Sequence, residues 1–441
     1  MKNLPIITIY ITNYNYGTYI KKAINSALEQ SYKNIDLIII DDASTDFSKR
    51  IIKKYEKYDR VRIIYNKPKK GLIKSSNIAV RASKGEFVLR LDADDYLKKD
   101  CLKILYSKIK KNNNVAMVYS DYYEIDSNDN VLIKQKQIDI NSISTLKDRP
   151  VLAACCLIRK SALFSVNLYD EKFNRQDGYD LWYKLIKEFN FKYVSKPLFF
   201  YRKHLNNLTS NKILLYKTRS QILKKYAYEK IKKLNIIGLV PVRSEKIEKN
   251  IHYLKKLKKK PILFHTIDET IKSTLISKII LTSPDKKLLL AAKKKYNNKI
   301  NYHLRKKEHA LLNTDLKVGV LDALKKIKKK IDIIIILDVE YPFKKYFYIE
   351  QAISKLILHN CDRVISSVFT INSNYYKYSK NGIQLISNDK LSALRYERKT
   401  ILKEAGGIAV IKYKAYKTNK VRKISNIIID NESSKSINKY D

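Results

Sequence analysis

The chain has 441 residues, which predicts two or three domains and excludes a single small binding module. Hydrophobic residues make up 45% and aromatic residues 11%, enough apolar surface to exclude disorder over most of the length. Lys and Arg number 90 against 43 Asp and Glu, a formal net charge of +47. This charge could attract polyanions, but the joint excess of Lys, Ile, Asn and Tyr with scarce Gly and Pro favours codon bias in an AT-rich genome.

The four cysteines follow neither metal-ligand spacing nor a disulfide framework, which fits a reducing compartment. The sequence runs from Met1 straight into an alternating, strand-like segment with no signal-peptide pattern, and its longest aliphatic runs are of strand length. We therefore expect a cytoplasmic protein that does not span a membrane, with peripheral contact at the inner membrane face left open by the charge.

Short β-branched runs alternate with helical stretches in the first half of the chain. Strands are expected at "IITIYIT", "IDLIIID", "VRIIYN" and "EFVLRLD", and helices over Tyr19 to Gln30, after Thr45, and around Ser75 to Ser83. This alternation predicts a parallel, doubly wound sheet. Continuously apolar strands suit a sheet covered on both faces.

A second series of the same kind follows a Lys-rich helical stretch. Its strands are expected at "NIIGLVPV", "SKIILTS", "KINYHLR" and "IDIIIILD", with helices capped near Asp268, ending about Tyr296, and around Val318 to Lys329. The sequence thus predicts an α/β protein with two tandem Rossmann-like domains, residues 1–212 and 235–441, joined by a linking helix over 213–234. The two domains differ, because strands of the first end in acids whereas the first strand of the second ends in Pro241 and Arg243.

Asp92, Asp94 and Asp95 come directly after an apolar strand in "LRLDADDYL". Ligands of open α/β sheets bind at the carboxyl ends of the strands. Three carboxylates so close repel one another, and Mg²⁺ or Mn²⁺ with diphosphate oxygens would relieve that repulsion. The alternative is an acidic, solvated turn that caps the next helix.

Residues 4 to 210 resemble the family 2 glycosyltransferases of the GT-A fold. The resemblance rests on four motifs in order, "ITIYITNYNYG", "IIIDDASTD", "KGLIKSSNIAVRASKGEFVLRLDADDYL" and "QDGYDLW". It implies that Tyr14 stacks on a nucleotide base and that Asp41 or Asp42 accepts a hydrogen bond from the base imide. It also implies that Asp92 contacts ribose and that Asp94 binds the metal. A core aromatic and helix-start acids are the structural alternatives.

The same resemblance makes Asp177 the candidate general base, with Asp180 as the alternative because Gly178 replaces an acid that the family often has. In "FYRKHLNNLTS", it implies that Arg202 pairs with diphosphate and that His204 ligates the metal. The implied reaction is a single displacement with inversion, from a UDP- or other nucleoside-diphosphate sugar to a glycan or lipid-linked acceptor. The family also often has Thr and Arg where Asn13 and Ser76 stand.

From Asn235 onward the chain resembles the acylneuraminate cytidylyltransferases, in "IIGLVPVRSEKIEKNI", "KKPILFHTIDETIKSTLISKIILTSPDKKL", "EAGGIAVIKYKAY" and "IIIDNESSKSINKYD". That family cradles a triphosphate with a Gly-rich loop. Here Glu245 follows Arg243 and Ser244 in a shorter loop, and only Asp430 remains of a terminal acid pair. We therefore expect a retained nucleotidyltransferase-like fold with lost catalysis, and Arg243, Lys249 and Asn250 as remaining candidates for ligand binding.

The leading hypothesis is a metal-dependent glycosyltransferase of surface polysaccharide biosynthesis. One alternative is a bifunctional enzyme that also activates an acidic sugar with CTP. Another is a basic protein that binds nucleic acid or a membrane surface. No zinc spacing, aromatic RNA-binding signature or Gly-rich RNA loop supports nucleic acid as a partner.

Overall fold

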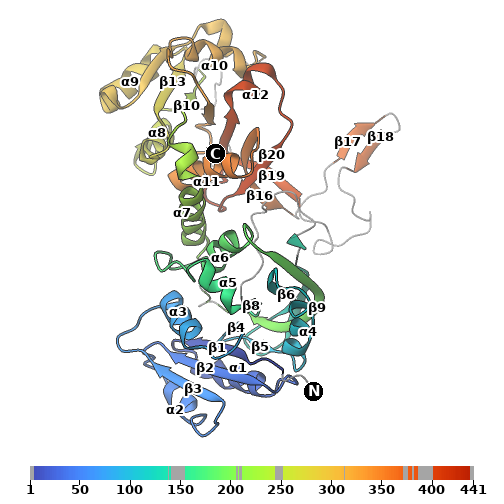
Figure 1. Cartoon of the computed structure of the whole chain (residues 1–441). Coiled ribbons are helices and arrows are strands. Elements are labelled where there is room, and N and C mark those ends of the chain that lie inside the picture. The colour runs from blue at the N-terminus through green and yellow to red at the C-terminus, as the bar shows by residue number, and fades with distance from the viewer. Residues whose placement is uncertain are drawn as a thin grey trace. The chain divides into compact units, whose positions relative to one another are not determined.

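The computed structural model describes residues 4–137, 139–140, 154–204, 207, 211–243, 252–311, 313–370, 376–379, 382–385 and 401–437. The chain divides into two compact units, Met1–Asn211 and Lys212–Asp441. Figure 1 labels helices and strands of both units and colours them from blue at the N-terminus to red at the C-terminus.

The first unit is an α/β unit built on one mixed sheet. Its strands are β1 (Ile7–Asn13), β2 (Ile35–Asp41), β3 (Val61–Tyr65), β4 (Phe87–Asp92), β5 (Tyr96–Leu97), β6 (Val115–Ile125), β7 (Val131–Gln135), β8 (Leu157–Arg159) and β9 (Asn190–Arg202). Its helices are α1 (Gly17–Leu28), α2 (Ser48–Lys53), α3 (Leu72–Ala82), α4 (Cys101–Ile109), α5 (Lys160–Ser165) and α6 (Asp177–Leu185).

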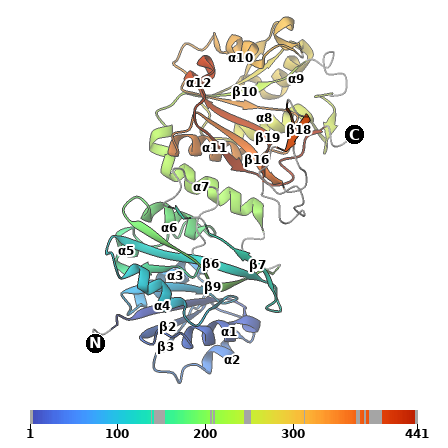
Figure 2. The ribbon, with the colours of Figure 1, turned by 90° about the vertical axis from the view of Figure 1, so that its right-hand side faces the viewer.

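The strand order β3-β2-β1-β4-β8-β6-β9-β5, with β7 beside β6, corrects the expectation of an all-parallel sheet. β3, β2, β1 and β4 run parallel, as expected from the strand–helix alternation. β8 then pairs antiparallel with both β4 and β6, and the long strands β6 and β9 pair in parallel (Figure 2). Antiparallel pairing needs no helical crossover, so the regular alternation ends after β4.

The central strands are buried because helices and loops cover both faces of the sheet. Every residue of β1 and of β2 is buried, which is the pattern expected for the middle of a parallel sheet. In β4, Phe87, Leu89 and Leu91 join the main hydrophobic cluster. Since side chains alternate along a strand, Val88, Arg90 and Asp92 point to the opposite face.

The second unit is also α/β. Its strands are β10 (Ile236–Pro241), β11 (Lys256–Leu257), β12 (Lys260–Pro261), β13 (Lys278–Ser283), β14 (Asn301–Leu304), β15 (Ile333–Leu337), β16 (Arg363–Thr370), β17 (Tyr376–Ser379), β18 (Gly382–Leu385), β19 (Ile401–Lys412) and β20 (Ile424–Ile428). Its helices are α7 (Lys212–Ile231), α8 (Ile262–Lys272), α9 (Lys286–Tyr296), α10 (Leu316–Leu324), α11 (Tyr346–Leu358) and α12 (Tyr413–Thr418).

The main sheet of this unit has the order β14-β13-β10-β15-β19-β16-β20. The first four strands are parallel, while β19 runs antiparallel to both β15 and β16. α7 occupies the stretch expected to link the domains, and it packs along α11 inside the second unit (Figure 2).

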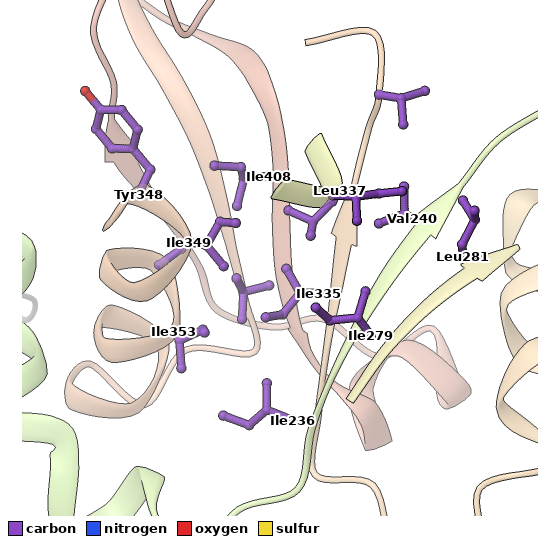
Figure 3. Close-up of a cluster of buried hydrophobic side chains, with 14 of the residues drawn as sticks. Ile236, Val240, Ile279, Leu281, Ile335, Leu337, Tyr348, Ile349, Ile353 and Ile408 are labelled. Carbon is purple, nitrogen blue, oxygen red and sulfur yellow. The ribbon is translucent and has the colours of Figure 1, made fainter. Parts of the chain in front are cut away.

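The core of the second unit lies between α11 and the sheet. Figure 3 shows Ile349 and Ile353 of α11 facing Ile335 of β15 and Ile408 of β19. A smaller cluster lies on the other sheet face, under α10. The alternation of apolar side chains to both faces explains why β15 reads as an unbroken isoleucine run.

Two helices of the second unit begin or end at residues other than those expected. Asp268 lies inside α8, which Pro261 precedes, and its carboxylate accepts from Lys260 Nζ at 2.6 Å instead of capping the helix. α10 begins at Leu316, after the Asp315 cap, and ends at Leu324. Among the described residues, no helix has both the length and the apolarity to cross a membrane.

Gly85 makes a close backbone approach that offers a test of the packing before β4. A Cβ there would lie 2.5 Å from the Thr8 nitrogen and 2.7 Å from the Ile6 oxygen. At Gly71, with φ of +89°, a Cβ would meet nothing within 4 Å. Because backbone atoms cannot move aside as a side chain does, we expect Gly85→Ala to lower the free energy of unfolding of the first unit by about 3 kcal/mol.

Gly71→Ala is the comparison, because only its backbone conformation is strained, with φ of +89° and ψ of 159°, at a cost of about 1–3 kcal/mol. Denaturant titration followed by far-UV circular dichroism measures both variants. A loss below about 1 kcal/mol in Gly85→Ala would show that the contacts of Gly85 do not matter.

Candidate active site

The carboxyl ends of three neighbouring strands bring polar side chains to one edge of the first sheet. Asn13 ends β1, Asp41 ends β2 and Asp92 ends β4. The strand register places Asn13 beside Asp41, and Thr12 beside Asp92. In open α/β sheets this edge is where ligands bind.

Asp41 and Asp42 are buried, and both carboxylates accept hydrogen bonds from the chain itself. Asp41 accepts from Asn13 Nδ2 at 2.9 Å, which ties the end of β2 to the end of β1. Asp42 accepts from the backbone N–H groups of Lys70 and Gly71, at 2.8 and 2.7 Å. Asp42 therefore anchors the loop that leads into α3, and Asp41 fixes the turn after β1.

Tyr14 is the first residue after β1, and it is 38% exposed. The Lys69 ammonium lies 3.2 Å from the centroid of its ring, a cation–π contact. Lys69 belongs to the loop that Asp42 anchors. An accessible aromatic ring thus stands at the edge of the sheet, and its stacking on a nucleotide base stays a prediction.

Arg90 binds two carboxylates that the sequence placed in different motifs. Its Nε and Nη2 donate to the two oxygens of Asp92 at 2.6 and 3.1 Å, and its Nη1 donates to Asp177 Oδ2 at 2.5 Å. Burial lowers the pKa of Arg90, but Asp92 and Asp177 outweigh it and hold that pKa well above its usual range. A permanent cation therefore lies between the two acids.

The side chains of Asp94 and His204, the two residues that the resemblance assigned to the metal, lie together. The two are joined by His204 Nε2 and Asp94 Oδ2, which are 2.9 Å apart. The imidazole stacks on Tyr19, at 5.8 Å between ring centroids, and meets the edge of Tyr16 at 5.7 Å. Burial, followed by the charges of Asp94, Asp92 and Asp95, raises the pKa of Tyr16.

Arg202 differs from the expectation of a guanidinium that pairs with diphosphate. The residue is 1% exposed, its Nε donates to the Asp94 carbonyl at 2.9 Å, and its Nη2 donates to Asp129 Oδ1 at 2.5 Å. Its backbone N–H donates to Asp95 Oδ1 at 2.9 Å. Because its donors are used internally, Arg202 holds the Asp94–Asp95 turn in place instead of facing a ligand.

The residues at this turn fit a divalent cation bound through few protein ligands. Within the described residues, no three or more His, Cys, Asp or Glu side chains form an enclosing metal site. One carboxylate and one imidazole, from Asp94 and His204, suit Mn²⁺ or Mg²⁺ when water and ligand oxygens complete the shell. Asp95 Oδ2 is buried without a hydrogen-bond partner, an acceptor left over beside this pair.

Asp177 and Asp180 differ in access. Asp177 begins α6, and its side chain is 11% exposed. The Asp180 side chain is 1% exposed and lies 3.5 Å from Lys184 Nζ. A substrate hydroxyl can approach Asp177 more easily, so the geometry favours Asp177 as the candidate base.

In the second unit, Arg243 lies two residues after β10 and is partly buried. Glu245, Lys249 and Asn250 fall outside the described residues. Asp430 is buried, and its Oδ2 accepts from the Tyr348 hydroxyl at 2.7 Å and from Ser433 Oγ at 2.8 Å. These bonds connect the segment after β20 to α11, so Asp430 stabilises the fold.

A cavity of about 560 Å³ opens at the carboxyl end of β15. Its lining includes an apolar floor from β15 and β19 and the charged side chains of Asp315, Asp338, Glu404 and Arg363. Beside it, burial lowers the pKa of Lys344 to about 7, and its amine donates to the carbonyls of Asp338 and Tyr341 at 2.5 Å. By binding these two carbonyls, the buried amine stabilises the loop after β15.

Sequence reasoning missed Arg90, Lys69 and the aromatic pair Tyr16 and Tyr19. Arg90 was recognisable in part, because it stands two residues before Asp92 on the same face of an otherwise apolar strand. Its contact with Asp177 was not, since 87 residues separate the two.

Residues 8–171 match the family model described as "Glycosyl transferase family 2". Chondroitin synthase from Escherichia coli is 29% identical over 246 residues, which cover 53% of this chain and 36% of the relative. Hyaluronan synthase from Pasteurella multocida is 28% identical over 218 residues, covering 49% and 22% of the two chains. The chain thus spans between a fifth and two fifths of the length of these curated relatives.

Among solved structures, S. aureus TarS 1–349 in complex with UDP-GlcNAc is similar with a TM-score of 0.42 and 20% identity, over 49% of this chain and 65% of that one. The stretch matched by the family model holds Tyr14, Asp41, Asp42, Asp92 and Asp94, and it ends before Asp177. The match places a family 2 glycosyltransferase domain over residues 8–171, within the first unit.

Proposed function

We propose that this chain transfers a sugar from a nucleoside-diphosphate sugar to a hydroxyl of a glycan or lipid-linked acceptor in surface polysaccharide biosynthesis. The observation that carries the proposal is the juxtaposition, at one sheet edge, of the Asp94–His204 pair with the Asp92–Arg90–Asp177 cluster. The family 2 domain and the polysaccharide synthases among the relatives support it.

In this proposal the nucleotide lies against the ends of β1, β2 and β4. Tyr14 stacks on the base and displaces the Lys69 ammonium from the ring face, which leaves that cation beside the nucleotide. Asp41 and Asp42 hold the surrounding turn and loop, and the base imide approaches this acidic edge. Asp92 accepts a hydrogen bond from a ribose hydroxyl, because each of its carboxylate oxygens can accept a further bond besides the one from Arg90.

The chemical step is a displacement at the anomeric carbon. The acceptor oxygen forms a bond to that carbon on one face, while the bond from the carbon to the diphosphate oxygen breaks on the other, with inversion. The acceptor proton passes to a carboxylate oxygen of Asp177. A divalent cation bound by Asp94 and His204 would offset the charge of the departing diphosphate.

For the second unit we propose a nucleotidyltransferase-like fold that has lost catalysis, as its sequence resemblance suggests. The bonds that occupy Asp430 support this, because a carboxylate held by Tyr348 and Ser433 is less available to a metal. The bifunctional alternative stays a prediction, as do a location in the cytoplasm and peripheral contact with an anionic membrane.

The metal assignment predicts that Asp94→Asn removes metal-dependent donor binding. In a thermal-shift panel of UDP-GlcNAc, UDP-GalNAc, UDP-glucuronate, UDP-glucose and GDP-mannose, we expect one donor to raise the melting temperature of the wild type when Mn²⁺ is present. A ligand at 100 times its dissociation constant stabilises the native state by about 2.7 kcal/mol. In Asp94→Asn this response should disappear.

Asp100→Asn is the matched control, because Asp100 is an exposed acid of the same connection, just before α4. It should keep the full response. A normal Mn²⁺-dependent shift in Asp94→Asn would show that the metal is bound elsewhere.

The base assignment predicts that Asp177→Asn lowers the rate of sugar transfer by roughly two to four orders of magnitude, the usual contribution of a positioned base. Donor affinity should stay within about fivefold, because Asp177 lies on the acceptor side. Initial rates at saturating donor and a UDP titration separate the two effects. If Asp180→Asn loses the activity and Asp177→Asn keeps it, the base is Asp180.

The proposal for the second unit predicts that the full-length chain releases no pyrophosphate from CTP with eight- or nine-carbon acidic sugars. A triphosphate site needs converging backbone amides and a metal held by acids, and general basicity does not supply that geometry. A coupled pyrophosphate assay with Mg²⁺ tests this. Release that is lost in Arg243→Ala would establish the bifunctional enzyme.

A further inference from the structure

Arg90 occupies a rigid position on β4. Its neighbour across the sheet is Tyr10 of β1, and its carbonyl accepts from the Cys155 backbone N–H at 2.8 Å. The side chain is 9% exposed and points to the face opposite the hydrophobic cluster. Because the backbone is paired on both sides and the side chain itself is largely buried, the guanidinium has little room to move away.

The planar guanidinium of Arg90 presents two separate edges to two acids. One edge binds both oxygens of Asp92, and the remaining nitrogen, Nη1, binds Asp177. The side chains of Asp92 and Asp177 are 24% and 11% exposed. Both acids thus remain reachable by ligands while they share one cation.

We propose that Arg90 is a positioning residue that couples the donor site to the general base, by holding Asp92 and Asp177 at once. This inference rests on the proposed function, in which Asp92 contacts the donor and Asp177 takes the acceptor proton. The coupling arises because one guanidinium donates to both carboxylates. When one carboxylate loses its negative charge, the attraction between the guanidinium and the other carboxylate becomes stronger. Such coupling is reciprocal between the two sites.

The direction of the change in UDP affinity distinguishes coupling through Arg90 from a direct effect of the Asp177 charge on the diphosphate. When Asp177 becomes Asn, Arg90 interacts more fully with Asp92 and weakens it as an acceptor for ribose. Direct removal of a negative charge near a diphosphate would strengthen nucleotide binding instead. Weaker binding in Asp177→Asn is therefore the signature of the shared arginine.

The test measures the affinity for UDP with Mn²⁺ by calorimetry, in full-length variants. In the wild-type background, Asp177→Asn should weaken UDP binding three- to fivefold. In the Arg90→Gln background, the same substitution should leave UDP binding unchanged or slightly tighter. This cycle uses binding alone, so its result does not depend on finding the acceptor.

Arg90→Lys is a second variant, for use if Arg90→Gln does not fold. It keeps the positive charge but loses the planar guanidinium that can bind two carboxylates at once. With the donor and acceptor that give turnover, we expect it to lower kcat ten- to hundredfold, with UDP affinity within threefold of the wild type. The matched control is Arg62→Lys, because Arg62 binds both oxygens of Asp36 at 2.9 and 2.6 Å, at the other end of β2. It should leave kcat within twofold.

An equal effect of Asp177→Asn on UDP affinity with and without Arg90 would overturn the inference, as would a normal kcat in Arg90→Lys. A wild-type chain that binds UDP but transfers no sugar would contradict the proposed function, and the binding cycle would still decide whether Arg90 couples the two acids. A chain that binds none of the nucleotides would overturn both.

Discussion

The first unit depends on how its sheet edge accommodates several acids in a small volume. The strand ends and the following turns bring together Asp41, Asp42, Asp92, Asp94 and Asp95, and α6 adds Asp177. Carboxylates at such distances destabilise one another unless donors or cations lie among them. The chain meets this need with backbone N–H groups, the side chains of Asn13 and Asn66, and two buried arginines, and these partners decide how accessible each acid remains.

The two arginines divide the site into a fixed part and an accessible part. Arg202 donates inward to the Asp94 carbonyl and to Asp129, so it holds the turn and leaves the Asp94 carboxylate to His204. Arg90 binds carboxylates that remain partly exposed. A buried charge without its partner is costly, and so both arginines also stabilise the fold that presents the acids.

The sequence predicts the parts of this arrangement that depend on local pattern. Apolar runs that end in polar residues locate β1, β2 and β4 within a residue or two, and the acids at the ends of β2 and β4 follow directly. It does not reveal β8, which enters the sheet antiparallel, because a three-residue strand has no periodicity. It also misassigns Arg202, since the guanidinium's partners come from a turn more than 70 residues away.

The net charge of +47 and the acidic edge act at different distances. The excess of Lys and Arg produces a long-range field that attracts anions, including the proposed nucleotide sugar, and is screened beyond about 8 Å at physiological salt. In the proposed function, the diphosphate of that ligand lies near Asp92, Asp94 and Asp95, which would repel it at short range where salt screens poorly. Only a charge inserted between the two, such as a divalent cation on Asp94 and His204, reverses that repulsion locally. Basicity can therefore speed the encounter, whereas the proposed binding at the edge would depend on the residues that hold such a cation.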